Sequence, residues 1–203
     1  MLLVPLDPYD LGDPLFLTQL ARDLAHRGGG GVLVHGSGEA GERALEATGA
    51  VARIHDGVWA VETPEQAAVV ERAARELNRR VVHELNEVGV SAVRVAGADR
   101  GLLKTDGAGL VAGPVGWVRD LAERGAAVVV ASLVAGKGPE LREVDALAAS
   151  AVLARALGTG RVTLFESGSS DAARARASAR AERLRAHDPG LDVAFARDLR
   201  SAE

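Results

Sequence analysis

The sequence predicts an α/β fold, specifically a three-layer αβα sandwich around a mainly parallel central sheet. Two observations carry this prediction. Short β-branched runs alternate with longer stretches of helical periodicity, which is the pattern of successive βαβ units. Apolar residues make up 47% of the chain but aromatic residues only 3%, so alanine, valine and leucine must fill the core. Side chains of this size suit the close packing of helices on a sheet.

The first quarter of the chain contains two predicted strands and two predicted helices. Leu2–Leu6 is a short apolar strand candidate, and the pairs Asp7-Pro8 and Asp13-Pro14 after it are turn signals. Pro14 opens a helix whose apolar stripe ends before the glycines at 28–31. The segments that follow are a buried strand at Gly31–His35, a tight turn at Gly36–Gly38 and a short helix at about 39–47.

The longest predicted helix lies near the middle of the chain. Thr63 caps it, Pro64 takes the first helical position, and apolar residues recur every three to four positions to about Val88. Gly89 ends the helix. Just before it, residues 51–61 form an irregular strand pair around Asp56-Gly57, which is a hairpin signal.

The second half continues the alternation of strands and helices. The predicted elements are a strand at Val90–Val95, a surface hairpin in the glycine-rich segment that ends at Gly113, a helix at Val115–Arg124, a strand at Ala126–Ser132, an exposed loop at Gly136–Pro139, a helix at Val144–Leu157, a strand at Val162–Phe165, a helix at Asp171–His187 and a last strand at Leu191–Ala196. No internal repeat or linker is apparent, so we expect one domain over residues 1–203.

Composition and charge argue against several classes of function. A formal net charge of −4 and a pI near 5.8 give no electrostatic reason to expect nucleic-acid binding. The chain has no cysteine, which excludes disulfides and thiolate metal sites, and its histidines lack metal-ligand spacing. The N-terminal segment has no basic region, and 18 apolar residues nowhere run uninterrupted. We therefore expect a cytoplasmic protein without a membrane segment.

Several motifs, in one order and at similar spacing, resemble those of the amino acid kinase family, especially acetylglutamate kinases and carrier-protein-linked aminoadipate kinases. Gly31–Gly38 resembles the family's strand that ends in His-Gly-Gly-Gly. Residues 77–80 resemble its long helix with an Asn-Lys pair, and residues 97–103 resemble its Gly-x-Asp-Gly segment. Glu140–Ser167 resembles its nucleotide-side core, with a charged lead-in, an Ala/Leu-rich helix, a Gly-x-Gly stop and a β-branched run.

The resemblance implies ATP and magnesium as cofactors, but the residues for that chemistry depart from the family's pattern. The lysine that would reach the transferred phosphate falls on Pro5, and the glycines after it fall on Asp7 and Pro8. Proline offers neither charge nor N–H, so this turn cannot cradle phosphate as the family's turn does. Leu147 takes the position of the organising aspartate. Because phosphoryl transfer depends on positioning and cations, these losses predict a catalytically impaired member.

The resemblance also implies a substrate-side half over about 1–125 and a shortened nucleotide-side half over about 126–203. The implied substrate-binding residues are His35, Gly36, Ser37, Gly38 and Trp59; the implied nucleotide-side residues are Phe165, Glu166, Ser167 and Gly168. Trp59 falls near the family's carboxylate-binding arginine, and Glu143 falls where an asparagine would touch substrate. A small carboxylate is the implied ligand. After Phe165 the family's long insertion and second lysine are missing.

Two residues are weak catalytic candidates. Lys137 lies on a loop near the C-terminal end of a strand, where it either replaces a lost phosphate contact or forms a solvated loop tip, the role we favour. Asp145 lies two residues before Leu147 and is either a magnesium ligand or a charge that complements the helix dipole. Two residues along a helix turn a side chain by about 200°. We therefore favour the second role for Asp145.

Three further patterns admit more than one interpretation. Gly36–Gly41 matches G-x-G-x-x-G after a strand, with Asp56 about 20 residues on, as in dinucleotide-binding proteins. The short helix after this turn and the extra strand and helix before it count against that interpretation. His35 either hydrogen-bonds a ligand or anchors the turn, and we favour the anchor. The arginines between 174 and 185 resemble an RNA-binding patch, but interleaved acidic residues favour a solvated helix face.

Three function hypotheses follow. The first is a catalytically impaired kinase homologue that acts as a binding or partner subunit. Because family members commonly pair through their long helix, the resemblance implies a homodimer, or a heteromer with an active relative, through residues 63–88. The second is an active kinase that phosphorylates the carboxylate of an acetylglutamate- or aminoadipate-like substrate. The third is an NAD(P)-binding module.

Overall fold

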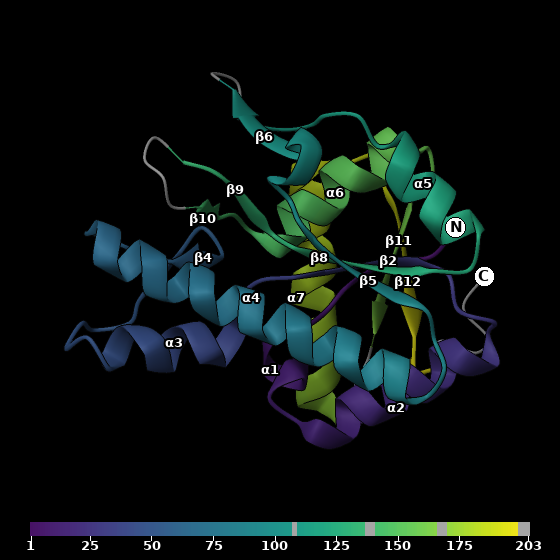
Figure 1. The fold of residues 1–203 in the computed structure, drawn as a ribbon, viewed down its shortest axis with the longest axis horizontal. Coiled ribbons are helices and arrows are strands. Elements are labelled where there is room, and N and C mark those ends of the chain that lie inside the picture. Colours follow the sequence, from purple (N-terminus) through teal and green to yellow (C-terminus); the bar gives the residue numbers. More distant parts are fainter. Residues whose placement is uncertain (107–108, 137–140, 166–169, 199–203) are drawn as a thin grey trace.

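The computed structural model describes residues 1–106, 109–136, 141–165 and 170–198, which fold as an α/β sandwich (Figure 1). Four parallel strands pair in the order β1 (Leu3–Pro5), β2 (Gly31–His35), β8 (Ala127–Ala131) and β5 (Ala92–Ala96). β11 (Arg161–Phe165) lies beside β1 and pairs in parallel with β12 (Asp192–Ala196). The predicted fold class is confirmed.

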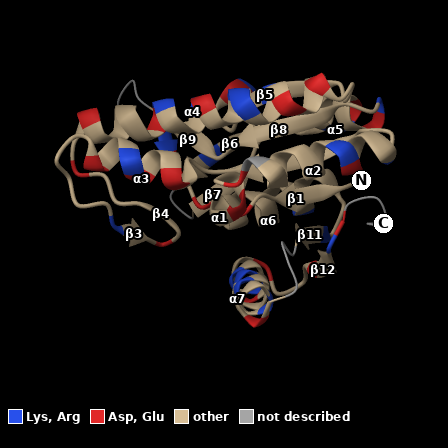
Figure 2. Ribbon diagram, turned by 90° about the horizontal axis from the view of Figure 1, so that it is seen from below, with Lys and Arg blue, Asp and Glu red and all other residues tan. Residues whose placement is uncertain are grey.

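The central strands are apolar on both faces because helices cover both. On one face, Leu33 of β2 and Val129 of β8 pack with α2 (Pro14–His26) and α4 (Pro64–Glu87). The neighbouring residues, such as Val128, point to the opposite face, as alternation along a strand requires. There they meet three helices: α5 (Gly116–Glu123), α6 (Ala146–Leu157) and α7 (Asp171–His187). Figure 2 shows α4 and α7 on opposite sides of the sheet.

The helices begin where the sequence places caps. Thr63 accepts a hydrogen bond from the N–H of Gln66 and starts α4, and Gly89 with φ of +83° follows its end, within a residue or two of the predicted bounds. α3 (Gly38–Glu46) packs along α4. Ser170 caps α7 in the same way through Ala173. The buried residues of α7 are Ala173, Ala177, Ala181 and Leu184, whose spacing fixes the helix face that meets the core.

Both predicted hairpins are present. β3 (Ile54–His55) and β4 (Val58–Trp59) pair around Asp56-Gly57, whose φ values of +50° and +82° suit a two-residue hairpin turn. β6 (Leu103–Asp106) and β7 (Gly109–Ala112) pair likewise after the short 3₁₀ turn Asp99–Gly101.

One short helix and one pair of short strands were not predicted. Asp7-Pro8 is a helix start rather than a turn, since the Asp7 carboxylate caps α1 (Pro8–Leu11) by accepting the N–H of Tyr9. β9 (Leu133–Ala135) pairs antiparallel with β10 (Leu141–Glu143) on either side of the predicted loop, of which 137–139 lie outside the described residues. Strands of three residues are too short to show a periodic pattern.

Among the helices that the structure describes, none has the length and apolar character needed to cross a membrane.

Candidate functional site

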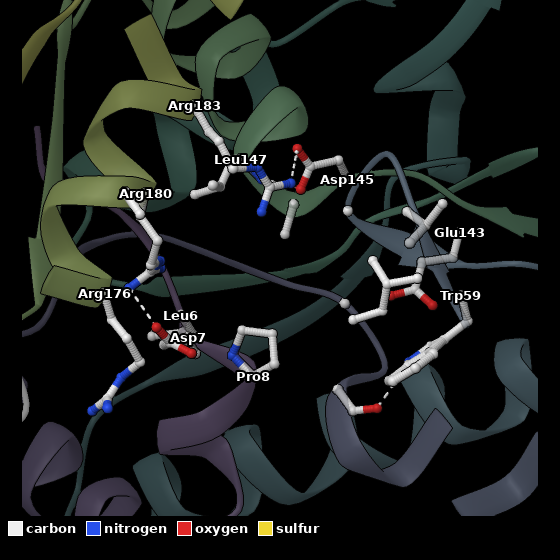
Figure 3. Close-up of a pocket in the computed structure, with 17 residues that line it drawn as sticks. Leu6, Asp7, Pro8, Trp59, Glu143, Asp145, Leu147, Arg176, Arg180 and Arg183 are labelled. Atoms are coloured by element: carbon white, nitrogen blue, oxygen red, sulfur yellow. Dashed lines mark hydrogen bonds and ion pairs between the residues drawn. The ribbon is translucent and has the colours of Figure 1, made fainter. Parts of the chain in front are cut away.

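A cavity of about 300 Å³ lies at the carboxyl ends of β1 and β2 (Figure 3). In open parallel sheets, ligands bind at this edge, where neighbouring strands continue in opposite directions. β1 continues to β2 on one side, whereas β11 beside it continues to β12 on the other. The lining comes from the residues after β1, the turn before α3, the β3–β4 hairpin, the residues around the start of α6, and α7.

An arginine–aspartate pair occupies the end of β1. Nη1 of Arg180, on α7, lies 3.2 Å from Oδ2 of Asp7, and its Nη2 donates to the carbonyl oxygen of Pro5 at 2.7 Å. Both side chains are largely buried, at 11% and 13% exposure. Burial lowers the pKa of Arg180, and the nearby carboxylates, Asp7 foremost, oppose that shift. The turn after β1 is thus neutralised and filled from within the chain.

Asp145 joins the start of α6 to α7. Its Oδ1 accepts the N–H of Leu147 at 3.2 Å, which makes it the N-cap of α6. Its Oδ2 lies 2.9 Å from Nη2 of Arg183 and 3.2 Å from Nε2 of His187. Both carboxylate oxygens therefore have partners within the protein. The structure places Asp145 at the helix start, as the favoured interpretation expected, and places Leu147 in the cavity lining.

Glu143, at the end of β10, holds the turn after β2. Its Oε1 accepts the backbone N–H of Ser37 and its Oε2 accepts the Ser37 hydroxyl, both at 2.6 Å. Burial raises the pKa of Glu143, and the negative charge of Asp145 adds to that rise, while the two bonds from Ser37 oppose it. A Cβ at Gly36 would collide with Oε1 of Glu143, so this contact requires glycine.

His35 lies beneath the turn rather than in the cavity lining. It is fully buried, and burial lowers its pKa to about 4, so the ring is neutral. Nδ1 faces the carbonyl oxygen of Gly36 at 2.8 Å and therefore carries the proton, while Nε2 accepts from Asn78 at 3.0 Å. Asn78 also donates to the carbonyl oxygen of Val129 at 3.0 Å. His35 thus anchors the turn to β8 through Asn78.

The β3–β4 hairpin covers the cavity. Trp59 lines it and donates from Nε1 to the carbonyl oxygen of Gly38 at 3.0 Å. At the hairpin turn, a Cβ added to Gly57 would lie 2.8 Å from Cγ of Asp145, so the turn rests directly on that carboxylate. Ile54 also lines the cavity, although 65% of its surface is exposed.

The glycines of the G-x-G-x-x-G motif have packing roles within the chain. Gly36 makes room for Glu143, Gly38 has a φ of +56°, and a Cβ at Gly41 would lie 2.9 Å from Cδ1 of Trp59. Asp56 lies in an antiparallel hairpin turn, and not at the end of the second parallel strand that a dinucleotide site requires. These contacts account for the motif without a dinucleotide.

Three arginines of α7 form one wall of the cavity: Arg176, Arg180 and Arg183. The interpretation of this series as a solvated helix face is wrong for Arg180, whose side chain is only 11% exposed, whereas that of Arg183 is 48% exposed. Their spacing of four and three residues puts all three on one side of the helix. Arg176 stacks on the ring of Tyr9, with 4.3 Å from its guanidinium carbon to the ring centroid. The regular spacing was the signal that the sequence offered.

Of the nucleotide-side residues, Phe165 lies in the core, where its ring meets Phe16 edge to face with centroids 5.3 Å apart. Glu166, Ser167 and Gly168 lie outside the described residues, as does Lys137. Within the described part of the chain, no three histidine, aspartate or glutamate side chains form a group that could hold a metal ion.

Sequence comparison finds relatives among kinases. No protein-family model matches the chain. An acetylglutamate kinase of Deinococcus radiodurans is 33% identical over 143 residues, which is 66% of this chain and 55% of that kinase. An acetylglutamate kinase of Chloroflexus aggregans is 34% identical over 99 residues, 48% of this chain and 39% of that kinase. The matches thus span about half, or less, of the length of these relatives.

Solved structures of similar fold include smu.665 of Streptococcus mutans, with a TM-score of 0.71, 16% identity and coverage of 98% of this chain and 95% of that one. N-acetylglutamate synthase of Neisseria gonorrhoeae has a TM-score of 0.68 and 19% identity, over 96% of this chain and 53% of that one. An isopentenyl phosphate kinase has a TM-score of 0.63 and 14% identity, over 98% and 92%. At these identities the likeness concerns the fold.

Proposed function

Because this chain is related to the amino acid kinase family, we propose that it is a catalytically impaired relative whose cavity binds one small ligand without transferring phosphate. The observation that carries the proposal is the pair of Arg180 and Asp7 at the end of β1. In the family that the chain resembles, this position holds a lysine that reaches the transferred phosphate, followed by glycines with free N–H groups. The chain has instead a proline, and a guanidinium already bound to a carboxylate and a carbonyl group.

Magnesium does not fit the described residues of this site. Asp7 is bound by Arg180 and caps α1, and Asp145 is bound by Arg183 and His187 and caps α6. Magnesium requires oxygen ligands in near-octahedral geometry and is usually held by one or two carboxylates together with substrate phosphates. Leu147 offers no oxygen in its side chain. These features support a ligand-binding role rather than phosphoryl transfer.

The size of the cavity supports the same proposal. Ligand pockets usually measure about 300–1,000 Å³. At about 300 Å³, this cavity lies at the lower end of that range, which suits one small molecule. ATP and magnesium belong to the chemistry of the family, and their use by this chain is the alternative proposal.

The partner-subunit part of the proposal concerns α4. Ala67, Ala68 and Val69 in its first turns are only half-buried, so they offer small apolar side chains to a second subunit. Either a second copy of this chain or an active relative would pack on them. Light scattering after size-exclusion chromatography tests self-association. A protein that is monomeric and binds no active relative would contradict the partner-subunit proposal.

An active kinase is the second candidate, favoured by 33–34% identity to two acetylglutamate kinases. A coupled assay for ADP separates the candidates, with ATP, magnesium and either N-acetyl-L-glutamate or aminoadipate derivatives. The Deinococcus radiodurans kinase is the positive control. We expect no ADP above the protein-free rate. Turnover that requires both magnesium and an acceptor would overturn the proposed function.

A further inference from the structure

A second cavity, of about 570 Å³, lies at the free edge of the four-stranded sheet, where β5 is the last strand. This β5 cavity shares no lining residue with the cavity at the ends of β1 and β2. Its volume lies within the usual range of ligand pockets, about 300–1,000 Å³. The residues that line it are Val93, Arg94 and Val95 of β5, Asp99 and Arg100 of the 3₁₀ turn, and Trp117, Asp120, Leu121 and Arg124 of α5.

The sequence of α5 directs one side of the helix at this cavity. Its four lining residues are spaced by three, one and three positions, so they lie on the same side of the helix. Val118 and Ala122, on the adjacent side, are buried in the core and fix the rotation of α5. The packing of the helix therefore keeps the indole of Trp117 at the cavity.

Arg100 and Trp117 form a stacked pair that borders the cavity. The guanidinium carbon of Arg100 lies 5.2 Å from the centroid of the Trp117 ring, within the range of a cation–π contact. The backbone of Arg100 is left-handed, with φ of +52°, a conformation that long side chains rarely adopt. Asp99 holds this turn by accepting the backbone N–H of Ala96 at 2.8 Å. Backbone outliers of this kind cluster at functional sites.

The indole N–H of Trp117 is an unused donor beside the cavity. Its Nε1 atom is buried and has no hydrogen-bond partner among the described residues. Because most buried polar groups in proteins have a partner, this donor points to an acceptor from outside the chain.

The free edge of β5 leaves a second donor, the backbone N–H of Arg94. On that edge, the side chain of Asn86 accepts the N–H of Ala92, and the side chain of Asp99 accepts the N–H of Ala96. Arg94 lies two residues from each, so alternation along the strand directs its N–H outward as well. Among the described residues, no strand pairs with this edge of β5.

The charged side chains of the β5 cavity suit a ligand with one negative charge. They belong to three arginines and two aspartates, which leaves one net positive charge. Within the part of the chain that the structure describes, Arg94, Arg100 and Arg124 form no ion pair. The apolar surface between these charges comes from β5 and α5. A ligand that matches the indole, the apolar surface and the charge is flat, aromatic and singly anionic.

We propose that the β5 cavity is a second binding site, which takes a flat aromatic molecule with one anionic group. The ring of the ligand packs against the indole of Trp117 and the guanidinium of Arg100, since both offer a flat face. Its anionic group accepts from the guanidinium of Arg124 and the backbone N–H of Arg94. This site goes beyond the proposed function and is independent of it, because different residues form the two cavities.

Three probes separate the ring from the charge. 2-Naphthalenesulfonate has both, 2-naphthol has only the ring at neutral pH, and methanesulfonate has only the charge. The readout is a ¹H–¹⁵N NMR titration of the two indole N–H signals, in which Trp117 reports on the β5 cavity and Trp59 on the first cavity. The variant Trp59→Phe assigns the two signals. We expect 2-naphthalenesulfonate to shift the Trp117 signal saturably, and each of the other probes to bind at least about tenfold more weakly.

Matched variants test the two arginines. Arg100→Gly removes the stacked guanidinium, and the variant should stay folded because glycine adopts a left-handed backbone without strain. Arg124→Gln, at an exposed position, removes a charge-assisted hydrogen bond. Each should weaken 2-naphthalenesulfonate binding about tenfold. Arg185→Gln is the control, because it removes the same charge from an exposed position outside both cavities, and thermal unfolding confirms that all three variants are folded.

Three results would each overturn the proposal: no saturable shift of the Trp117 signal, equal affinity for 2-naphthol and 2-naphthalenesulfonate, or equal affinity of the Arg100→Gly and Arg124→Gln variants and the Arg185→Gln control. A shift of the Trp59 signal at a lower probe concentration than that of Trp117 would place the probe in the first cavity, and would overturn the proposal as well.

Discussion

The guanidinium of Arg180 lies 3.2 Å from the carboxylate of Asp7, and this pair ties the last helix to the first strand across most of the chain. A second bond from Arg180 to the carbonyl oxygen of Pro5 completes the connection. Phosphoryl-transfer enzymes keep cations free to stabilise charge on the transferred group. Here the cation at the end of β1 is the guanidinium of Arg180, which is already bound to Asp7 and to the carbonyl oxygen of Pro5.

Removal of Arg180 should destabilise the protein. Arg180→Met leaves Asp7 as a buried, unpaired charge, and we expect the free energy of unfolding to fall by about 3 kcal/mol. Urea unfolding measures it. The double variant Asp7→Asn with Arg180→Met should recover part of the loss, because neither charge then remains unpaired. A double variant less stable than Arg180→Met alone would contradict the role of the pair.

Protonation of His35 should destabilise the protein in mild acid. Its pKa is about 4 in the folded protein against a model value of 6.5, so between these values the unfolded chain binds the extra proton more tightly. Stability is therefore full above about pH 6.5 and falls toward pH 4, by up to about 3 kcal/mol. Urea midpoints at pH 5 and pH 7.5 measure it. Glu143 acts in the opposite direction, because its pKa is higher in the folded protein than in the unfolded chain. Its contribution to stability is therefore lost as the pH rises from the unfolded-state pKa through the folded-state pKa.

The His35→Gln variant isolates the histidine. It retains the Glu143 contribution but lacks the histidine proton, so its stability should lose the rise with pH that His35 gives between pH 5 and pH 7.5. An equal pH dependence in both proteins would show that His35 does not titrate as its burial implies.

Alanine at position 36 should loosen the turn. A Cβ there collides with Oε1 of Glu143, and we expect a loss of about 1–3 kcal/mol. Gly116→Ala is the matched control, since a Cβ there meets nothing within 4 Å at the start of α5. That control should be neutral or slightly stabilising. Adding Glu143→Asp to Gly36→Ala should restore part of the stability, because the shorter side chain leaves room; no recovery would argue against this contact as the cause.

Substitutions of Asp145 should distinguish capping from ion pairing. Asp145→Asn keeps a good cap for α6 and loses the charge, and Arg183 is 48% exposed, so a loss below about 1 kcal/mol is expected. Asp145→Ala loses the cap as well and should cost about 1–2 kcal/mol. Thermal unfolding with and without 10 mM magnesium adds a second test. Stabilisation by magnesium that depends on Asp145 would favour a metal site instead.

Much of the fold could be predicted because its signals are local. The alternation of strands and helices, the cap at Thr63 and the Asp56-Gly57 turn each lie within a few neighbouring residues. The sequence predicts a turn where α1 begins, because an Asp-Pro pair can start either a turn or a helix.

The site was harder to predict because its parts are far apart in sequence. The turn at Gly36–Gly38 and Trp59 follow from motif resemblance, and the structure places Gly36, Gly38 and Trp59 at the cavity. The contact between Asp7 and Arg180 joins residues from opposite ends of the chain, and no local pattern encodes it. The environment of His35 is likewise tertiary, since its hydrogen-bond partner Asn78 lies on α4, 43 residues away in the sequence.

Trapping the reaction product tests most directly whether this protein transfers phosphate. ATP, magnesium and N-acetyl-L-glutamate are incubated with the protein in hydroxylamine, which converts any acyl phosphate to a hydroxamate, with the Deinococcus radiodurans acetylglutamate kinase as the positive control. We expect no hydroxamate above the protein-free blank. Hydroxamate that accumulates in proportion to protein concentration and requires magnesium would contradict this expectation.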